Sequence, residues 1–187
     1  MERLATLQAV EAEVWRQLGE ATATVTGRAH GWRTPVLATT DGQRADARTV
    51  VLREVDAANR HLWFYSDRRT AKLAQLTSHP DATLVMWCGA LGWQLRCRVR
   101  LVLEAPGPAT ASRWARIKGS PSAQDYLSPL PPGTPRGTEP AEPPSPSTDR
   151  NFAVIRAALM SLDWLELHRD GHRRAIFDDQ APRWVQP

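Results

Sequence analysis

From residue 32 onward the chain consists of short β-prone runs that are separated by turn signals. The first run is "WRTPVLATT" (32–40), and turn signals follow at Asp41-Gly42, in "DAANR" (56–60) and at 89–92. In "WQLRCRVRLVLE" (93–104) apolar and polar residues alternate, which indicates a strand with one buried and one solvated face. This rhythm continues for roughly a hundred residues and favours an antiparallel barrel or sandwich over a parallel sheet with crossover helices.

Three segments have the spacing of helices. Residues 3–19 carry apolar side chains three and four positions apart and end at Gly19, which predicts an amphipathic N-terminal helix. The segments "TAKLAQL" (70–76), with Thr70 as the N-cap, and "PATASRWARIK" (108–118) predict two shorter helices. We therefore expect a mainly β protein with flanking helices.

Length and composition are those of a single folded domain spanning residues 1–187. Hydrophobic residues make up 42% of the chain and charged residues 24%, and the net charge of +4 is not concentrated in a block. Cys88 and Cys97 are too few for a disulfide framework and have no partners at zinc-ligand spacing. With neither a signal-peptide core nor a membrane span in the sequence, we expect a cytoplasmic protein without a metal, a membrane or a nucleic-acid partner.

Residues 119–150 interrupt the strand pattern. Nine of the fifteen prolines lie between Pro121 and Pro146, a composition that cannot build a core. We interpret this range as an exposed, flexible loop inside the domain, because strand-like sequence returns at 152–178. A recognition segment is the alternative, since "PLPP" is compatible with a polyproline II helix.

Cationic side chains surround two of the predicted strands. Arg48 and Arg53 bracket the apolar run of "RTVVLR", and "LWFYS" leads directly into Arg69 and Lys72 at the predicted helix start. A helix N-terminus with cations beside it suits an anion such as a phosphate, whereas a solvated strand end is the alternative that spacing leaves open. Arg48 and Arg53 are five residues apart, so either the strand is bulged or only one of them, by preference Arg48, contacts the ligand.

Five segments in order along the chain carry a resemblance to a known family. They are "LATTDGQRADARTVVLR", "LWFYSDRRTAKLAQLTSHPDATLVMW", "WQLRCRV", "DWLELHRDGHRRAIF" and "RWVQP", within residues 30–104 and 152–187. Together they resemble the pyridoxamine 5′-phosphate oxidase family of FMN-binding split barrels. The resemblance implies a six-stranded antiparallel Greek-key barrel and a homodimer with FMN at the subunit interface. It also implies hydride transfer from pyridoxamine or pyridoxine 5′-phosphate to FMN, with reoxidation by oxygen giving hydrogen peroxide and pyridoxal 5′-phosphate.

The same resemblance implies a set of site residues. The positions that match FMN-binding residues of the family are Arg48, Thr49, Val50, Val51, Leu52, Arg53, Tyr65, Ser66, Arg69, Lys72, Gln94, Trp164 and Arg174. Among them Lys72 is expected to meet the phosphate, Gln94 the polar edge of the ring, and Trp164 to lie near the flavin. The positions that match substrate-binding residues are Arg53, Lys118 and His172, of which Arg53 and His172 are candidates for a catalytic role.

Several positions depart from the family pattern. Arg53 stands in place of a lysine, and Ala71 in place of an arginine for which Arg69 is the nearest substitute. Asp170 reverses the charge of an arginine that stands over the substrate ring, and only Trp114, Lys118 and Ser122 echo the substrate-phosphate set. The resemblance therefore supports flavin binding without settling the substrate. A different small-molecule substrate and a non-catalytic flavin carrier or sensor stay open, and a basic nucleic-acid module is a weaker third alternative.

Overall fold

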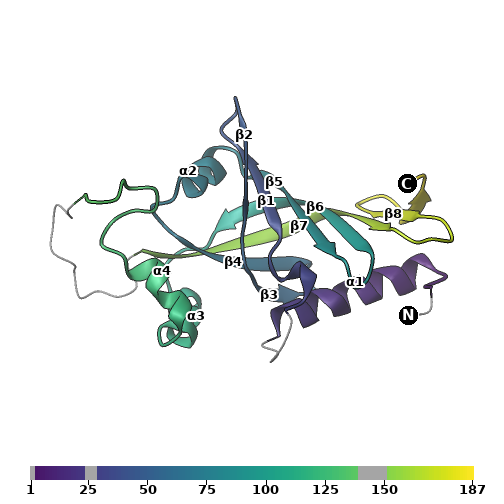
Figure 1. The fold of residues 1–187 in the computed structure, drawn as a ribbon, viewed down its shortest axis with the longest axis horizontal. Helices are drawn as coiled ribbons and strands as arrows, with labels where there is room; N and C mark the ends of the chain where they lie inside the picture. Colours follow the sequence, from purple (N-terminus) through teal and green to yellow (C-terminus); the bar gives the residue numbers. More distant parts are fainter. Residues whose placement is uncertain (1–2, 24–28, 139–150) are drawn as a thin grey trace.

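The computed structural model describes residues 3–23, 29–138 and 151–187. In these residues nine strands form one antiparallel sheet. Helices lie around this sheet (Figure 1). This confirms the expected mainly β fold with flanking helices. No helix in these three ranges is both long enough and apolar enough to cross a membrane.

The elements follow one another along the chain in mixed order. The helices are α1 (Leu7–Thr22), α2 (Ala71–Ser78), α3 (Pro108–Ile117) and α4 (Gln124–Leu127), with short 3-10 turns η1 (Gly31–Arg33) and η2 (Pro121–Ala123). The strands are β1 (Val36–Thr40), β2 (Ala45–Thr49), β3 (Leu52–Asp56), β4 (His61–Asp67), β5 (Asp81–Cys88), β6 (Trp93–Leu103), β7 (Phe152–Glu166), β8 (Arg173–Phe177) and β9 (Arg183–Val185).

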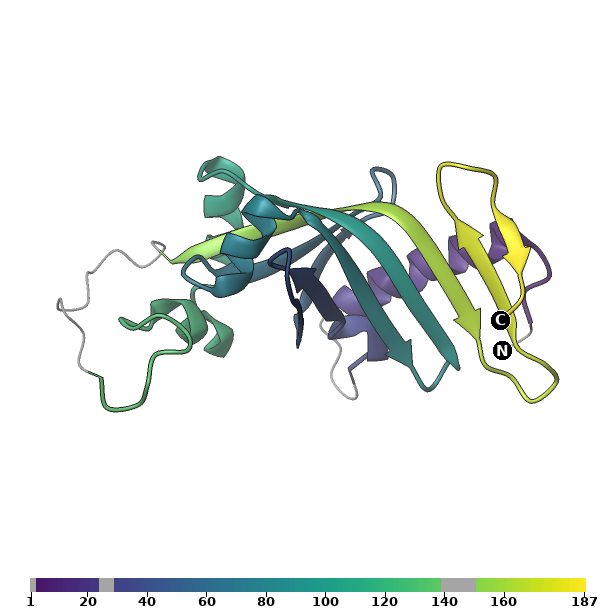
Figure 2. The same cartoon turned by 90° about the horizontal axis from the view of Figure 1, so that it is seen from above.

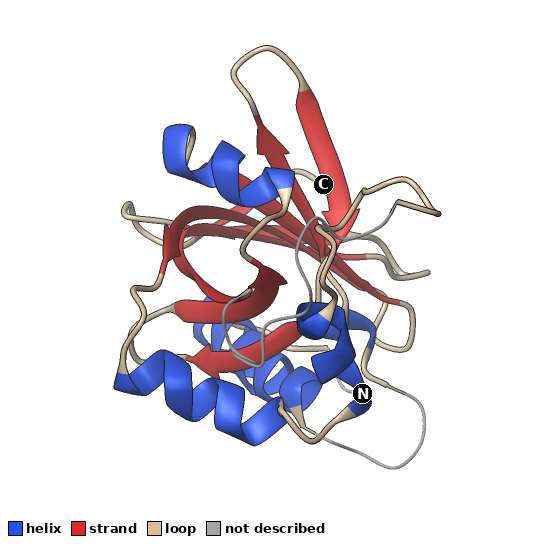
Figure 3. Ribbon diagram, turned by 90° about the vertical axis from the view of Figure 1, so that its left-hand side faces the viewer, coloured by secondary structure: helices blue, strands red, loops and turns tan. Residues whose placement is uncertain are grey.

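The connection between β2 and β3 explains why the sheet curls. The strand order is β2-β1-β5-β6-β7-β4-β3, so these two strands lie at opposite ends of the path. In the chain only Val50 and Val51 separate them, and each Cα step covers about 3.8 Å. The sheet therefore has to roll up until its two ends approach each other, which Figure 3 shows. It is not a closed six-stranded barrel, because β2 and β3 are not paired with each other in the described part of the chain.

Strand β7 is the longest element of the sheet and crosses most of the molecule (Figure 2). It pairs with β6 along one edge. On its other edge it pairs first with β4, through Phe152–Ala158, and then with β8, through Leu162–Glu166. The hairpin of β8 and β9 thus extends the sheet far from the β4 end.

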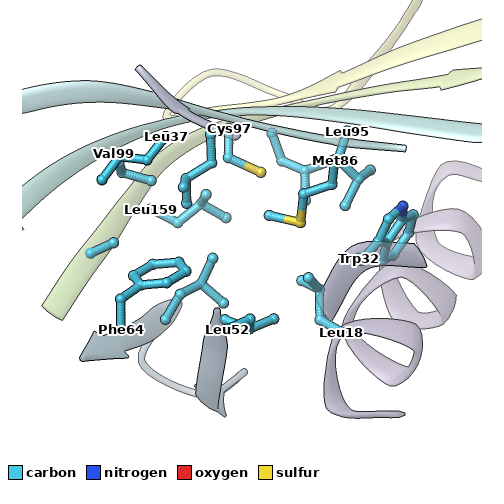
Figure 4. Close-up of a cluster of buried hydrophobic side chains, with 14 of the residues drawn as sticks. Leu18, Trp32, Leu37, Leu52, Phe64, Met86, Leu95, Cys97, Val99 and Leu159 are labelled. Carbon is cyan, nitrogen blue, oxygen red and sulfur yellow. The ribbon is translucent and has the colours of Figure 1, made fainter. Parts of the chain in front are cut away.

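The main core fills the inner face of the curled sheet. The alternation predicted for β6 is confirmed, because Trp93, Leu95, Cys97 and Val99 are buried while Arg96 and Arg98 are exposed. Helix α1 covers part of this core with Val10, Val14, Leu18 and Ala21, which recur at helical spacing. Figure 4 shows Leu18 and Trp32 on the helical side of the core and Met86 and Leu95 on the sheet side.

Helix α1 begins and ends later than the expected range 3–19. It begins at Leu7 because Thr6 caps it, its side-chain oxygen accepting a hydrogen bond of 3.2 Å from the Ala9 N–H. It continues past Gly19 because Ala21 prolongs the buried stripe, and the packing of that stripe outweighs the low helix propensity of one exposed glycine.

Part of the proline-rich range is folded. Ala123 and Tyr126, from η2 and α4, join a second buried cluster with Trp114, Phe152 and Val154. The interpretation of 119–150 as an exposed, flexible loop therefore does not describe its first residues, because aromatic side chains hold η2 and α4 against β4 and β7. Residues 139–150 lie outside the described part of the chain.

Gly31 offers a stability test of the packing between η1 and β5. A Cβ atom at this position would lie 2.7 Å from the carbonyl oxygen of Trp87 and 2.8 Å from the Cα of Cys88. Both are backbone atoms that no rotamer change can move, so Gly31→Ala is expected to lower the free energy of unfolding by about 2 kcal/mol. Urea unfolding measures this.

Gly19→Ala is the matched control for Gly31→Ala. A Cβ atom at Gly19 would meet nothing within 4 Å, and the position is inside a helix, so this change is expected to be neutral or stabilising. A similar loss in both variants would contradict the packing described for Gly31.

Candidate functional site

One group of predicted site residues lies where β4 ends and α2 begins. Thr70 occupies the N-cap position of α2, but its side chain makes no capping hydrogen bond, so the first N–H groups of the helix lack a side-chain acceptor. Lys72 lies in the first helical turn and is half-buried, and within the described residues it forms neither a hydrogen bond nor an ion pair. Burial, and after it the nearby charge of Arg48, lower the pKa of Lys72.

Arg48 connects β2, β1 and α2 beside this lysine. Its guanidinium donates hydrogen bonds to Thr39 Oγ1 at 2.6 Å and to Gln75 Oε1 at 3.3 Å. It also pairs with the carboxylate of Asp46. The charge of Arg48 is thus partly compensated within the chain, whereas Lys72 has no ion pair among the described residues and is influenced by the charge of Asp67 without a hydrogen bond to it.

Arg69, the nearest substitute for the cation missing at Ala71, is engaged by other groups of the chain. Its Nε and Nη2 bind the buried carboxylate of Asp67 at 3.0 and 2.6 Å. Its Nη1 and Nη2 also donate to the backbone carbonyls of Pro129 and Ser128, at 3.2 and 2.9 Å. All three nitrogen atoms of the guanidinium are therefore engaged in holding the 128–129 segment against the end of β4.

Arg53 lies at a β-bulge of β3, whereas Arg48 lies on β2, so the expectation that both belong to one strand is wrong and the bulge does not account for their spacing. The register of β3 against β4 shifts between Leu52 and Glu54. The Arg53 guanidinium packs over the ring of Tyr65, 5.4 Å from its centroid. Its Nε is buried without a hydrogen-bond partner in the described part of the chain.

Tyr65 and Ser66 face opposite sides of β4, as neighbours on a strand do. The Tyr65 hydroxyl donates to Glu54 Oε1 at 2.7 Å, and Arg113 from α3 binds the same carboxylate through Nε at 3.0 Å and Nη2 at 2.9 Å. Burial and the bond to Glu54 raise the pKa of Tyr65 far above its ordinary value, so the hydroxyl stays a neutral donor. Ser66 is buried on the other face, with its Oγ 3.2 Å from Thr70 Oγ1.

The residues that echo a substrate-phosphate set do not converge. Trp114 is 7% exposed and packs against Phe152 and Tyr126 in the second cluster. Lys118 is exposed just past the end of α3, and Ser122 bonds to Ser120. Of the three, only Lys118 presents a charge to a ligand.

A second group of predicted residues lies on the outer face of the sheet near β8. Gln94 pairs with Leu165, which in turn pairs with Arg174, so the three lie in one row across β6, β7 and β8. The Arg174 Nε and Nη2 bind the Asp163 Oδ1 and Oδ2 at 2.9 and 2.7 Å. A groove of about 390 Å³ runs beside this row and is lined in part by Arg96, Arg98, Asp163 and Arg174.

Trp164 points away from this outer face. It is 0% exposed and packs edge to face against Trp93, with ring centroids 5.2 Å apart. The outward residue of the row is its neighbour Leu165, because side chains alternate along β7. His172 is exposed in the turn between β7 and β8, where its Nδ1 accepts a hydrogen bond of 3.1 Å from the His168 N–H.

The two groups are far apart within one chain. Ser66 pairs with Ala153 and Arg174 pairs with Leu165, and these two partners are twelve steps apart along β7. At about 3.3 Å per residue this is about 40 Å along the strand, which exceeds the length of an FMN molecule. The remaining predicted positions lie between Arg48 and Arg53: Thr49 ends β2, Val50 and Val51 form the link, and Leu52 begins β3.

Two carboxylates that hold arginines in these groups, Glu54 and Asp163, could not be predicted from the sequence as site residues. Glu54 meets Arg113 from 59 positions away, and Asp163 meets Arg96 across β6 and β7, 67 positions apart. Only the pairing of strands and the docking of α3 bring these charges together.

Comparison with known proteins adds the family. Residues 12–103 match the family model of the pyridoxamine 5′-phosphate oxidase FMN-binding domain. The chain carries an FMN-binding domain of the pyridoxamine 5′-phosphate oxidase family. The resemblance inferred from the five segments is thereby confirmed, and FMN is the cofactor of this domain family. None of the curated proteins matches the chain.

Solved structures share the fold over most or all of the chain. A pyridoxamine 5′-phosphate oxidase-related, FMN-binding protein from Nostoc punctiforme is 22% identical with a TM-score of 0.71, and all of both chains is covered. PhzG from Burkholderia lata, solved with tetrahydrophenazine-1-carboxylic acid, is 15% identical over 84% of this chain and 83% of its own, with a TM-score of 0.66. General Stress Protein 26 from Bacillus anthracis is 12% identical over 92% and 99%, with a TM-score of 0.53.

The residues present fit the cofactor of this family. A phosphate needs cations and N–H donors, and the α2 start offers Lys72 without an acceptor together with an uncapped helix N-terminus. The outer face near β8 offers the amide of Gln94 and the free donors of Arg174 for the polar edge of a flavin.

Proposed function

We propose that the protein is an FMN-dependent oxidoreductase whose FMN sites are built from two copies of the chain. The observation that carries the flavin part is Lys72, a half-buried cation that no acceptor in the described residues satisfies. Burying an ammonium group without a partner costs free energy, and a phosphate at the start of α2 would offset this cost.

The separation of the two residue groups supports a site shared between subunits. Arg48, beside Lys72, lies in the inward-facing row of Leu37, Leu84, Cys97 and Leu162, whereas Gln94 and Arg174 lie in an outward-facing row. One chain therefore presents the two groups on opposite faces of its sheet. In a symmetric dimer, the α2 start of one protomer can face the β8 end of its partner. Two equivalent sites then form, each with a phosphate half and a ring half.

Exposed apolar residues on the outer face of the sheet support the same arrangement. Val36 and Trp87 lie on one face of β1 and β5 and are 37% and 48% exposed, and Met160 on β7 is 52% exposed. Large apolar side chains exposed close together mark a contact surface more often than open solvent. We assign this face to the contact between the two protomers.

When bound, FMN would accept a hydride equivalent from a small-molecule substrate. The chain's own residues would bind and orient: Lys72 and Arg48 would hold the phosphate, and Gln94 and Arg174 would hold the polar edge of the ring. Arg53, stacked on Tyr65 with a free Nε, is the cation best placed to orient an anionic substrate. Pyridoxamine and pyridoxine 5′-phosphate are the first substrates to test, although Trp114 is buried and Asp170 carries the opposite charge to the family's arginine.

Titration with FMN tests the flavin part of this proposal. The purified protein is expected to bind about one FMN per chain, with flavin absorbance retained after gel filtration and a molecular mass of two chains by light scattering. Protein that stays colourless after incubation with FMN would exclude the proposal. Failure of every vitamer to reduce the bound flavin under anaerobic conditions would leave flavin binding intact and remove only that substrate class.

Subunit mixing tests whether one site draws on two chains. Lys72→Met and Arg174→Ala are each expected to weaken FMN binding when alone. If the two variants are unfolded and refolded together, random pairing gives mixed dimers in which one site is intact, and about a quarter of the wild-type sites should return. Refolding each variant separately is the control, and absence of recovery in the mixture would place the whole site within one chain.

A flavin carrier or sensor without turnover is the second candidate. It is favoured by the charge reversal at Asp170, which is exposed in the turn before β8. Reduction of the bound flavin by a vitamer phosphate or a reduced nicotinamide within seconds would count against it.

A further inference from the structure

Asp163 binds two arginines at once on the outer face of the sheet. Its Oδ1 and Oδ2 accept hydrogen bonds from Arg174 Nε and Nη2 at 2.9 and 2.7 Å. From the other side Arg96 donates its Nε to Oδ2 at 3.1 Å and adds its Nη2. The Asp163 side chain is 15% exposed, so the carboxylate sits under the two guanidinium groups and not in open water.

Strand register explains this geometry. Arg96 lies directly opposite Asp163 in the pairing of β6 with β7, and Arg174 lies on β8 two residues from Ile176, the β8 partner of Asp163, and so on the same face. The carboxylate therefore sits between two strands' arginines on a single face. Burial alone would raise the pKa of Asp163, and the hydrogen bonds from Arg174 and Arg96 more than offset this, so that its pKa lies below the ordinary value.

The same contacts determine which donors remain free. Within the described residues, the Nη1 groups of both Arg96 and Arg174 have no hydrogen-bond acceptor, because each arginine uses Nε and Nη2 on Asp163. Both guanidinium groups line the groove of about 390 Å³. Two planar guanidinium groups fixed by one carboxylate present a preformed pair of donors, which lowers the entropy cost of binding an acceptor.

We propose that Asp163 is a positioning residue that holds Arg96 and Arg174 as one ligand-facing pair, and that Arg96 contacts the flavin ring together with Arg174. This rests on the proposed FMN site and extends it by two residues. The triad carries a net charge of +1, one unit less than the two guanidinium groups would carry without Asp163, so it would stabilise the negative charge of a reduced flavin less than two unpaired arginines would. Asp163 thereby sets how strongly the site favours reduced over oxidised flavin.

The test measures FMN affinity and the reduction potential of the bound flavin. Arg96→Ala and Arg174→Ala are each expected to weaken FMN binding by about ten- to a hundredfold, the range for a lost hydrogen bond from a charged donor. Asp163→Asn is expected to weaken the binding of oxidised FMN severalfold, because the arginines lose their orientation. It should also make the reduction potential more positive, because two guanidinium charges are then no longer balanced.

Matched controls separate positioning from general stability. Arg100→Ala changes an exposed arginine four residues after Arg96 on the same face of β6. Glu104→Gln removes a carboxylate that pairs with Arg156 at 2.7 Å elsewhere in the sheet. Neither is expected to change FMN affinity or potential. Asp163→Glu keeps the charge and should leave the potential closer to that of the wild type than Asp163→Asn does, which keeps the test valid if the asparagine variant unfolds.

The experiment distinguishes failure of this inference from failure of the proposed FMN site. If the wild-type protein binds no FMN, the FMN site itself is wrong and this inference falls with it. In the other case the wild type binds FMN, with an affinity that Arg174→Ala lowers. If Arg96→Ala then has the same FMN affinity as Arg100→Ala, and both Asp163 variants keep the wild-type reduction potential, only this inference is overturned.

Discussion

Lys72→Met is expected to raise the Kd for FMN by about ten- to a hundredfold and to leave the flavin-free protein as stable as the wild type or more stable. The change removes a cation that would meet the phosphate but keeps a side chain of similar length. In the free protein the charge has no acceptor among the described residues, so its loss relieves a cost.

The pH dependence follows from the lowered pKa of Lys72. Burial, followed by Arg48, lowers it below the ordinary value of 10.5, so the unfolded chain binds the proton more tightly than the folded one. The cost of the charge is fully present below the lowered pKa and disappears as pH rises through 10.5. FMN affinity should decline over the same alkaline range, because a neutral amine no longer attracts the phosphate.

Thermal unfolding of the flavin-free protein and FMN titration at several pH values measure both effects. Arg100→Met is the matched control, since Arg100 is an exposed cation whose nearest carboxylate, Asp81, is 3.6 Å away. An equal loss of FMN affinity in both variants would show that Lys72 does not meet the phosphate.

Trp164→Ala is expected to lower the free energy of unfolding by about 3–5 kcal/mol. The side chain is fully buried on the inner face of β7, in contact with Trp93 and near Trp184, so its removal leaves a large cavity. Urea unfolding measures the loss. Leu167→Ala, at an apolar position in the turn after β7 that is 43% exposed, is expected to cost far less.

Trp164→Phe separates the structural role from the flavin contact that the sequence predicted. It keeps an aromatic ring in the core, so the protein should fold and bind FMN with close to wild-type affinity. Gln94→Ala, in the outward row, should weaken binding instead. If Trp164→Phe weakens FMN binding as much as Gln94→Ala does, the flavin contact predicted from the sequence is correct. The side chain of Trp164 would then contact the flavin in the FMN-bound protein despite its inward orientation here.

Much of the fold could be predicted from local patterns. Helices α2 and α3 match the expected ranges 70–76 and 108–118 to within two residues at each end, because capping and proline signals are local. Helix α1 was shifted, since a buried stripe outweighed Gly19 as a stop. Residues 121–127 were predicted to be loop, because their proline content obscured the contribution of Tyr126 to an aromatic cluster.

The sequence indicates which residues are candidates for the site, but it does not give the orientation of their side chains or their partners. The parity argument for Arg48 and Arg53 assumed one strand, but the chain passes from β2 to β3 between them, a break that the apolar run in "RTVVLR" does not reveal. Residue-by-residue matching does not give the orientation of Trp164, because a one-residue offset along a strand reverses the face, and its flavin contact stays a prediction. Arg69 shows another limit, since its guanidinium is engaged by Asp67 and two backbone carbonyls.

The sequence by itself determined that this chain forms an antiparallel sheet with cations beside a helix start, and it pointed to FMN. These features depend on alternation, capping and motif order, which are local along the chain. Only the tertiary structure decided which cations are free. Lys72 has no partner in the described residues, while Arg96 and Arg174 share Asp163, because charge pairing depends on strand register between residues that are far apart in sequence.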